Sequence, residues 1–282
     1  MDVSVVIPVN NEAGNIERLL NEIDEALTGR LDYEIVVVDD GSSDETPMIL
    51  RDVQRRNPRL RVLQHERCCG QSTSVVTGVW ATRSDIVATL DGDGQNDPQD
   101  IPEMVAALRS GHATRNVQLI AGHRQKRNDT AWRKFCSRIA NRVRMAMLRD
   151  DTPDSGCGSK VFFRETFLRL PYFNHMHRFL PALVLRAGGC VQSVPVHHRE
   201  RDRGRSHYGT LGRMTQGIVD LCGVMWLIHR SRVAVSHELA AMPRLHLATD
   251  DAPILNHALH APAASTAGSI DADQPIRVRK AA

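Results

Sequence analysis

The sequence predicts an α/β protein with a mostly parallel central sheet whose faces are covered by helices. Two observations carry this prediction. In the first 91 residues, short apolar runs alternate with longer segments of helical periodicity, and alternation at this spacing is typical of parallel strands joined by helical crossovers. In addition, three of the apolar runs end in polar and acidic residues, as expected where the strands of such a sheet meet a ligand.

The expected elements begin with a strand at 3–9 (VSVVIPV), and the segment 10–27 that follows is expected to contain a helix. One helical face of this segment collects its apolar residues, namely Ile16, Leu19, Leu20, Ile23 and Leu27. The remaining expected elements of this half are a strand at 34–40, a helix at 46–56, a strand at 61–65, a helix at 71–81 and a strand at 85–91.

The second half of the chain is less regular. Its clearest features are an arginine-rich stretch at 122–144, a strand-like run at 190–196 and a basic segment at 197–209. From Ser236 onward the composition shifts to Ala, His, Pro, Asp and Ser without apolar periodicity, which predicts a mobile tail. We therefore expect one main domain over 1–215, an amphipathic helix over 216–235 and a disordered tail over 236–282, with no internal repeat.

Composition supports one globular domain and argues against several classes of protein. The chain has 282 residues, of which 41% are hydrophobic and 24% charged, and its formal net charge is only +3, so we expect no nucleic-acid partner. The six cysteines include no CxxC pair. The adjacent Cys68 and Cys69 make a poor disulfide or zinc pattern, so reduced cytosolic thiols are expected.

Neither a signal peptide nor a membrane span is expected. Met1 and Asp2 lead directly into the first strand. A membrane span needs about 18 to 20 consecutive apolar residues, and the nearest run, 217–229, is shorter and contains Asp220.

The polar strand ends predict a binding site. They read PVNNE, VDDGSSDE and LDGDGQND, and all three would lie at the carboxyl edge of the sheet, where α/β proteins of this kind bind ligands. In the last of them, Asp91 and Asp93 are two residues apart just past a strand, so both carboxylates can turn toward one ion. Hard oxygen ligands of this kind suit Mg²⁺ or Mn²⁺.

Three other interpretations of this acidic loop were weighed. An EF-hand fails because Asn96 stands at its obligatory glycine position and Pro102 at its bidentate glutamate position. A phosphatase-like aspartate nucleophile would want threonine where Gln95 stands. The DxD pattern by itself is equally compatible with a plain acidic turn before a helix that begins near Pro98. The polar ends of the neighbouring strands favour the metal site.

The other two strand ends contribute candidate contacts to a nucleotide. Asp39 and Asp40 end a buried strand and either form an Asx-type turn or contact a base or ribose. Pro8, Asn11 and Glu12 close the third loop, where Glu12 equally suits the first turn of a helix.

The arginine-rich stretch is too basic for a simple amphipathic helix. Its notable members are Arg124, Arg127, Arg133 and Arg138. A diphosphate leaving group beside a divalent ion needs additional cationic hydrogen-bond donors. One arginine guanidinium can donate two parallel hydrogen bonds to a phosphate. For Arg142 and Arg144 the expected role is an ordinary solvated face.

Together the motifs resemble those of a known family. In order they are VSVVIPVNNEAGNI, EIVVVDDGSSDET, GQSTSVVTGV, LDGDGQNDPQDIP, GHRQKRNDTAWRKFCSRIAN, DSGCGSKVFFRE, HRFLPAL and HRERDRGRSHYG. This series is similar to family 2 glycosyltransferases of the polyprenyl-phosphate (dolichyl-phosphate mannose synthase-like) branch, and the resemblance covers about residues 1–230.

The resemblance implies a GT-A fold and inverting transfer of a hexose from a nucleotide sugar (UDP- or GDP-hexose) to a polyprenyl phosphate. It assigns the metal, Mg²⁺ or Mn²⁺, to Asp91, Asp93 and Gln95. It places the donor nucleotide at Asp39, near Pro8, Asn11, Glu12, Asp40 and Gln71, and the phosphates at Arg124 and Arg133. Asp154 would lie near the transferred sugar, and Arg201, Ser206 and His207 would engage phosphate.

Two departures from the family pattern stand out. His207 stands where lysine or arginine is usual, and a neutral imidazole binds phosphate less well, although Arg203 and Arg205 are positioned to compensate. Many bacterial relatives also append two transmembrane helices after this domain, which this chain is not expected to have. The segment 217–230 either lies on a membrane surface or packs back on the domain. We expect a peripheral protein on the cytoplasmic face of a membrane, with the membrane or a membrane protein as partner.

The expected acceptor determines the expected chemistry. A phosphate monoester is already ionised near neutral pH, because its second pKa is about 6. Asp154 is therefore expected to orient groups or stabilise charge, whereas a hydroxyl acceptor would need a carboxylate base. The alternatives are such a hydroxyl-directed glycosyltransferase of polysaccharide synthesis, or a non-catalytic sugar-nucleotide-binding protein. A Rossmann dehydrogenase is excluded because no GxGxxG follows the first strand.

Overall fold

The structure is a computed structural model that describes residues 1–124, 142, 144–199 and 210–230. All of them belong to one compact unit, Met1–Val235. The expected tail 236–282 lies outside the described residues.

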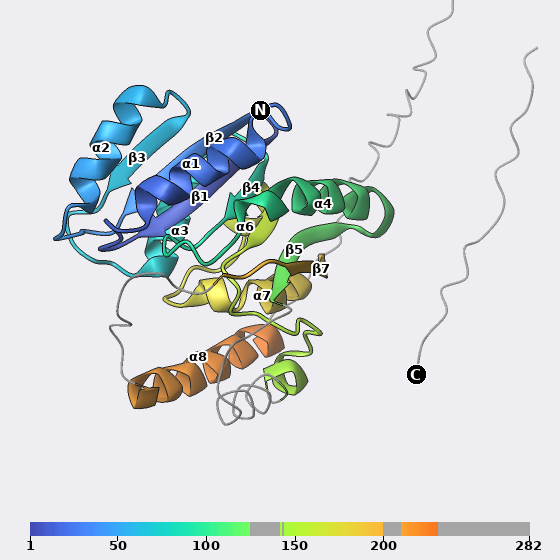
Figure 1. Cartoon of the computed structure of the whole chain (residues 1–282). Helices are drawn as coiled ribbons and strands as arrows, with labels where there is room; N and C mark the ends of the chain where they lie inside the picture. Colours follow the sequence, from blue (N-terminus) through green and yellow to red (C-terminus); the bar gives the residue numbers. More distant parts are fainter. Residues whose placement is uncertain (125–141, 143, 200–209, 231–282) are drawn as a thin grey trace, which may run out of the picture. The chain divides into compact units, whose positions relative to one another are not determined.

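The first half has the elements that its sequence predicts, in the predicted order (Figure 1). They are β1 Val3–Val9, α1 Ile16–Leu27, β2 Tyr33–Asp39, α2 Thr46–Arg56, β3 Leu60–Gln64, α3 Gln71–Ala81 and β4 Ile86–Thr89. The five apolar residues assigned to one face of α1 are all buried, because that face packs on the sheet.

The second half adds three strands. Its elements are η1 Pro98–Asp100, α4 Ile101–Arg115, β5 Val117–Arg124, β6 Lys160–Phe163, α6 Arg164–Leu168, η2 Met176–Arg178, α7 Leu180–Arg186, β7 Cys190–Val196 and α8 Thr210–Arg230. The strand at 190–196 is confirmed, whereas β5 and β6 were not anticipated.

The seven strands form one sheet in the order β3-β2-β1-β4-β6-β5-β7. Strand β6 runs antiparallel to both of its neighbours, β4 and β5. The other pairs, β1–β2, β1–β4, β2–β3 and β5–β7, are parallel. The mostly parallel sheet is thus confirmed, and β1, β2, β4 and β5 all end at the same edge.

Helices cover both faces of the sheet, and each face has its own apolar core. One core contains buried residues of α1, α2 and α4, such as Leu20, Leu50 and Met104. The other contains residues of α3, α6, α7 and α8, such as Val79 and Val224. Alternate residues of a strand enter opposite cores because successive side chains point to opposite faces.

Helix α8 is amphipathic, and one of its faces packs back on the domain. Val224 is buried with α3 and α7 residues, and Leu221, Met225 and Ile228 pack beside it. The opposite face presents Val219 and Trp226, which are 64% and 60% exposed, and Ile218, at the flank of the packed face, is 57% exposed. No helix in the described part of the chain is long and apolar enough to cross a membrane.

The structure corrects one expectation about the basic stretch. Arg142 is exposed, as expected, but Arg144 is buried. The Arg144 guanidinium donates to both carboxylate oxygens of Asp150, at 2.7 and 2.6 Å. A buried guanidinium needs such a partner. Arg144 therefore stabilises the turn at Asp150, and it does not belong to a solvated face as expected.

Candidate active site

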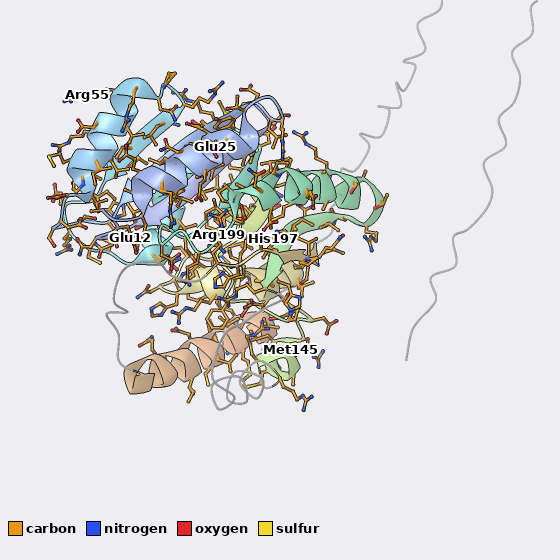
Figure 2. All side chains as sticks on the ribbon, viewed as in Figure 1. Glu12, Glu25, Arg55, Met145, His197 and Arg199 are labelled. Atoms are coloured by element: carbon orange, nitrogen blue, oxygen red, sulfur yellow. The ribbon has the colours of Figure 1, made fainter. Side chains whose placement is uncertain are left out.

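The polar strand ends meet at one edge, as the topology requires. Strands β1, β2 and β4 are adjacent and parallel, so the loops after Val9, Asp39 and Thr89 lie side by side. Figure 2 labels Glu12 from the first of these loops and Arg199 from the chain that follows β7, and both lie along this edge.

Asp91 lies on this edge, next to the start of α3. Its Oδ1 accepts a hydrogen bond from Nε2 of Gln71, the first residue of α3, at 2.7 Å. Asp91 is half-buried, and the loss of solvation, followed by the nearby charge of Asp93, raises its pKa to about 6. Gly158 leaves the space that its carboxylate occupies, since a Cβ there would clash with all three carboxylate atoms.

Asp93 and Gln95 share a tight turn with Asp91. The Asp93 Oδ1 accepts from the Gln95 backbone N–H at 3.2 Å, and Gly94 has a φ of 72°, a backbone conformation that favours glycine. The Gln95 side-chain amide donates to the Arg199 carbonyl at 3.5 Å. The structure thus brings Asp91, Asp93 and Gln95 into one loop.

Arg199 fastens this loop to its surroundings. Its backbone N–H donates to the Gln95 carbonyl at 2.9 Å. Its guanidinium contacts Asp97 at 2.8 Å and Glu22 of α1 at 2.7 Å. The beginning of the basic segment 197–209 is therefore tied to the acidic loop, a link that the sequence did not suggest.

The loop fits a divalent cation. Two carboxylates close enough for Asp93 to raise the pKa of Asp91 are stabilised by a shared positive ion. Carboxylate and amide oxygens are ligands that Mg²⁺ and Mn²⁺ accept. The assignment of Asp91, Asp93 and Gln95 to a metal stays a prediction that their chemistry allows.

A second group, Asp40, His65 and Cys69, also has potential metal-ligand atoms within 4.8 Å of one another. Its hydrogen bonds argue against a metal. The Asp40 carboxylate accepts from the His65 ring at 2.7 Å and from the Cys69 and Gly70 backbone N–H groups at 2.9 and 2.7 Å. With the Cys68 thiol added at 3.3 Å, donors occupy both oxygens. Asp40 thus braces the loop before α3, and its contact with a nucleotide stays a prediction.

The neighbouring candidates are also held by the protein. Asp39 is buried and accepts from the Ser42 backbone N–H at 3.0 Å and from the Gln64 amide at 2.9 Å. Asn11 has a φ of 58°, and its Oδ1 accepts from the Ser43 N–H at 2.8 Å, which links the first two loops.

Glu12 and Pro8 complete the first loop. The Glu12 N–H donates to the Thr46 hydroxyl at 2.9 Å, and its carboxylate accepts from Asn15 at 2.8 Å. Glu12 thus precedes α1 and connects it with α2. Pro8 lines a pocket beside Asp91.

Arg124 and Asp154 form an ion pair with each other. The Arg124 Nε and Nη2 donate to the two Asp154 oxygens at 2.6 and 2.8 Å. This contact raises the pKa of Arg124 further above its usual value. The sequence assigned the two residues separate roles, and the structure joins them at the end of β5, on the same edge as Asp91.

Sequence reasoning missed two residues of the pocket beside Asp91. Lys160 and His177 line it together with Pro8, Gln71 and Gly158. Burial lowers the pKa of both Lys160 and His177, and the His177 Nδ1 is 2.7 Å from the Ser72 hydroxyl. The available signal was a lysine at the start of the apolar run KVFF, where a buried cation is unusual.

Several predicted phosphate-binding residues lie outside the described residues. They are Arg127, Arg133, Arg138, Arg201, Arg203, Arg205, Ser206 and His207.

Comparison with known proteins identifies the fold and family. The family model described as glycosyl transferase family 2 matches residues 4–170. The chain is 33% identical, over 81% of its length, to a dodecaprenyl-phosphate galacturonate synthase of Rhizobium johnstonii. It is 34% identical, over 73% of its length, to an undecaprenyl-phosphate 4-deoxy-4-formamido-L-arabinose transferase of Enterobacter sp.. It spans 68% and 62% of the lengths of these two relatives.

Solved structures share the architecture. A mannosyltransferase from Pyrobaculum calidifontis in complex with GDP-Man and Mn²⁺ matches with a TM-score of 0.62 and 22% identity, covering 83% of this chain and 66% of that one. Glucosyl-3-phosphoglycerate synthase from Mycobacterium tuberculosis, with Mn²⁺, UDP and phosphoglyceric acid, matches with a TM-score of 0.57 and 20% identity, covering 82% and 79%. The fold is therefore the GT-A fold, and the chain belongs to glycosyl transferase family 2.

Proposed function

We propose that this protein is an inverting, metal-dependent glycosyltransferase that moves a hexose from a nucleotide sugar to a polyprenyl phosphate. The observation that carries the proposal is the identity of 33–34% to relatives whose names specify polyprenyl-phosphate acceptors. The acidic loop at the carboxyl edge of the sheet supports a role for Mg²⁺ or Mn²⁺. The fold neighbours hold UDP in one case and GDP-Man in the other, so both nucleotides are candidates.

The acidic loop and its neighbours have distinct roles in this mechanism. Asp91 and Asp93, with Gln95, would hold the metal, which supplies positive charge to the diphosphate leaving group. Gln71 holds the Asp91 carboxylate in place through its 2.7 Å hydrogen bond. Asp39 and Glu12, on the neighbouring loops, would contact the donor nucleotide.

The Arg124–Asp154 pair favours a phosphate acceptor. Both Asp154 oxygens accept from the Arg124 guanidinium, so this carboxylate orients the arginine and is poorly placed to take a proton. An acceptor phosphate is ionised at neutral pH, because its second pKa is about 6, and needs no base. Arg124 in turn provides a fixed positive charge for developing negative charge.

The protein would act at a membrane surface, on its cytoplasmic face. Support comes from the exposed face of α8 that presents Val219 and Trp226, since apolar helix faces bury themselves in the lipid headgroup region. Free cysteines, including Cys157 and Cys222, agree with a reducing compartment. A membrane protein is the other candidate for the surface that α8 meets.

The test is a transfer assay. The purified full chain is incubated with Mn²⁺ or Mg²⁺, undecaprenyl phosphate and one radiolabelled sugar nucleotide at a time. We expect label to enter the organic phase with one donor, and EDTA to stop the transfer. Sugar oligomers replace the lipid in a parallel arm. Transfer to these oligomers, or nucleotide release without a lipid product, would refute the proposal.

A further inference from the structure

Lys160 is a buried lysine that the mechanism above does not use. It opens β6, is 4% exposed, and its ammonium donates to the Cys157 carbonyl. One carbonyl satisfies only one of its three N–H donors and none of its charge. A lysine is rarely buried without an anionic partner.

Strand register places Lys160 next to the acidic loop. Thr89 of β4 pairs with Lys160 of β6 in antiparallel register. Continuing this register by two residues brings Asp91 opposite Gly158, and the clash expected for a Cβ at Gly158 confirms that the Asp91 carboxylate lies there. Asp91 and Lys160 are therefore diagonal neighbours on one face of the sheet, within reach of a long side chain.

Lys160 is the one lysine or arginine among the described residues that line the pocket beside Asp91. The nearby guanidinium of Arg124 is already matched by Asp154. His177 adds no charge at neutral pH, because burial holds its pKa well below the usual value. In the described part of the chain, Lys160 is thus the nearby cation that no carboxylate pairs with. The charges of Asp91 and Lys160 each shift the pKa of the other residue toward its charged form.

We propose that Lys160 is the internal countercharge of Asp91, and that it makes metal binding to the free enzyme weak. Before the metal arrives, the ammonium partly neutralises the acidic loop. A divalent ion entering the loop is then repelled by a fixed positive charge that does not leave. A nucleotide diphosphate brings at least two negative charges and outweighs this repulsion, so metal and donor bind as a pair. This inference rests on the proposed function, because it takes Asp91 as a metal ligand.

The experiment measures Mn²⁺ affinity directly. Free Mn²⁺ is quantified by electron paramagnetic resonance during titration of the full chain, with and without UDP or GDP. Two variants remove the charge: Lys160→Met keeps the volume, and Lys160→Gln also keeps a donor for the Cys157 carbonyl. Arg164→Gln is the matched control, since this cation follows the far end of β6 and its guanidinium donates to the Val79 and Trp80 carbonyls.

For the wild type we expect weak Mn²⁺ binding alone and a large gain with nucleotide. Both charge-removing variants should bind Mn²⁺ alone about tenfold more tightly, a change of about 1.4 kcal/mol, and gain correspondingly less from nucleotide. Lys160→Arg and Arg164→Gln should behave like the wild type. Unchanged or weaker Mn²⁺ binding in both Lys160→Met and Lys160→Gln, with wild-type circular dichroism, would overturn the inference alone. If no protein bound Mn²⁺ even with nucleotide, the metal-dependent function would fall with it.

Discussion

Replacing Asp91 by asparagine tests whether the acidic loop is built for an ion at the expense of stability. Asparagine has nearly the same shape, and its Oδ1 can still accept from Gln71, which donates to Asp91 at 2.7 Å. The substitution therefore keeps the shape and removes the charge, together with its attraction to Lys160, which the pKa of Asp91 already includes. In the folded protein the pKa of Asp91 is raised from 3.8 to about 6 by burial and by Asp93, so its ionised form is unfavourable there.

The size of the effect follows from linkage between protonation and folding. A carboxyl whose pKa is raised by folding destabilises the protein as pH rises, because the unfolded chain then holds the charge more easily. With pKa values of 3.8 and about 6, the ionised Asp91 costs about 3 kcal/mol at pH 7 and about 1.6 kcal/mol at pH 5. Asp91→Asn should therefore raise the free energy of unfolding by up to these amounts.

The measurement is urea unfolding in EDTA at pH 7 and pH 5. Asp52→Asn is the control, since Asp52 is exposed on α2 and pairs with the likewise exposed Arg55 on the same helix, and it should change stability by less than about 0.5 kcal/mol. Adding Mn²⁺ with UDP or GDP should stabilise the wild type but not Asp91→Asn, because only the wild type binds the ion well. An Asp91→Asn protein that is no more stable than the wild type at pH 7, or whose gain grows at pH 5, would refute the reasoning.

Three further predictions concern other parts of the site. Gly158→Ala should displace the Asp91 carboxylate by steric clash and lower Mn²⁺ affinity in the presence of nucleotide by more than tenfold in the same titration; wild-type affinity would show that the carboxylate does not need that space. Arg124→Met should lower the free energy of unfolding by about 3 kcal/mol or more, because it removes the guanidinium that contacts both oxygens of the buried Asp154 carboxylate. Asp154→Asn should keep substantial lipid transfer in the radiolabel assay, and complete loss of transfer in Asp154→Asn would favour a hydroxyl acceptor. Trp226→Ser should reduce co-sedimentation with anionic liposomes several-fold, while serine at the equally exposed Trp80 of α3 should not; equal losses in both variants would remove α8 as the membrane contact.

The elements that sequence predicts well are those with a strong local signal. Helix α1 follows from its apolar stripe, and α2 and α3 begin and end at the residues expected. The acidic loop was also predicted, because Asp91 and Asp93 directly follow a recognisable strand and the topology places the end of that strand at the carboxyl edge. Strand β5 was missed because its last residues, up to Arg124, overlap the arginine-rich stretch 122–144, whose basic residues hide the end of the apolar run.

The features that sequence did not predict depend on contacts between distant residues. The antiparallel β6 has only four residues, too few for a reliable periodic signal. The Arg124–Asp154 pair joins positions 30 residues apart, and nothing local in either segment indicates that one binds the other. Asp40 shows the same limit, since its buried hydrogen bonds come from a loop that only the folded chain brings near.

Strand β6 joins two parts of the sheet that come from separate stretches of the chain. Strand β4 ends the first series of parallel strands, and its neighbour in the sheet is β6, which comes more than 70 positions later. The pocket beside Asp91 is thus lined by two stretches that are joined in the sheet where β4 pairs with β6, with Asp91 contributed by one and Gly158 by the other. Substitutions in the later stretch can therefore reshape the pocket while β1, β2 and β4 stay unchanged, provided that a small residue remains at position 158 opposite the Asp91 carboxylate.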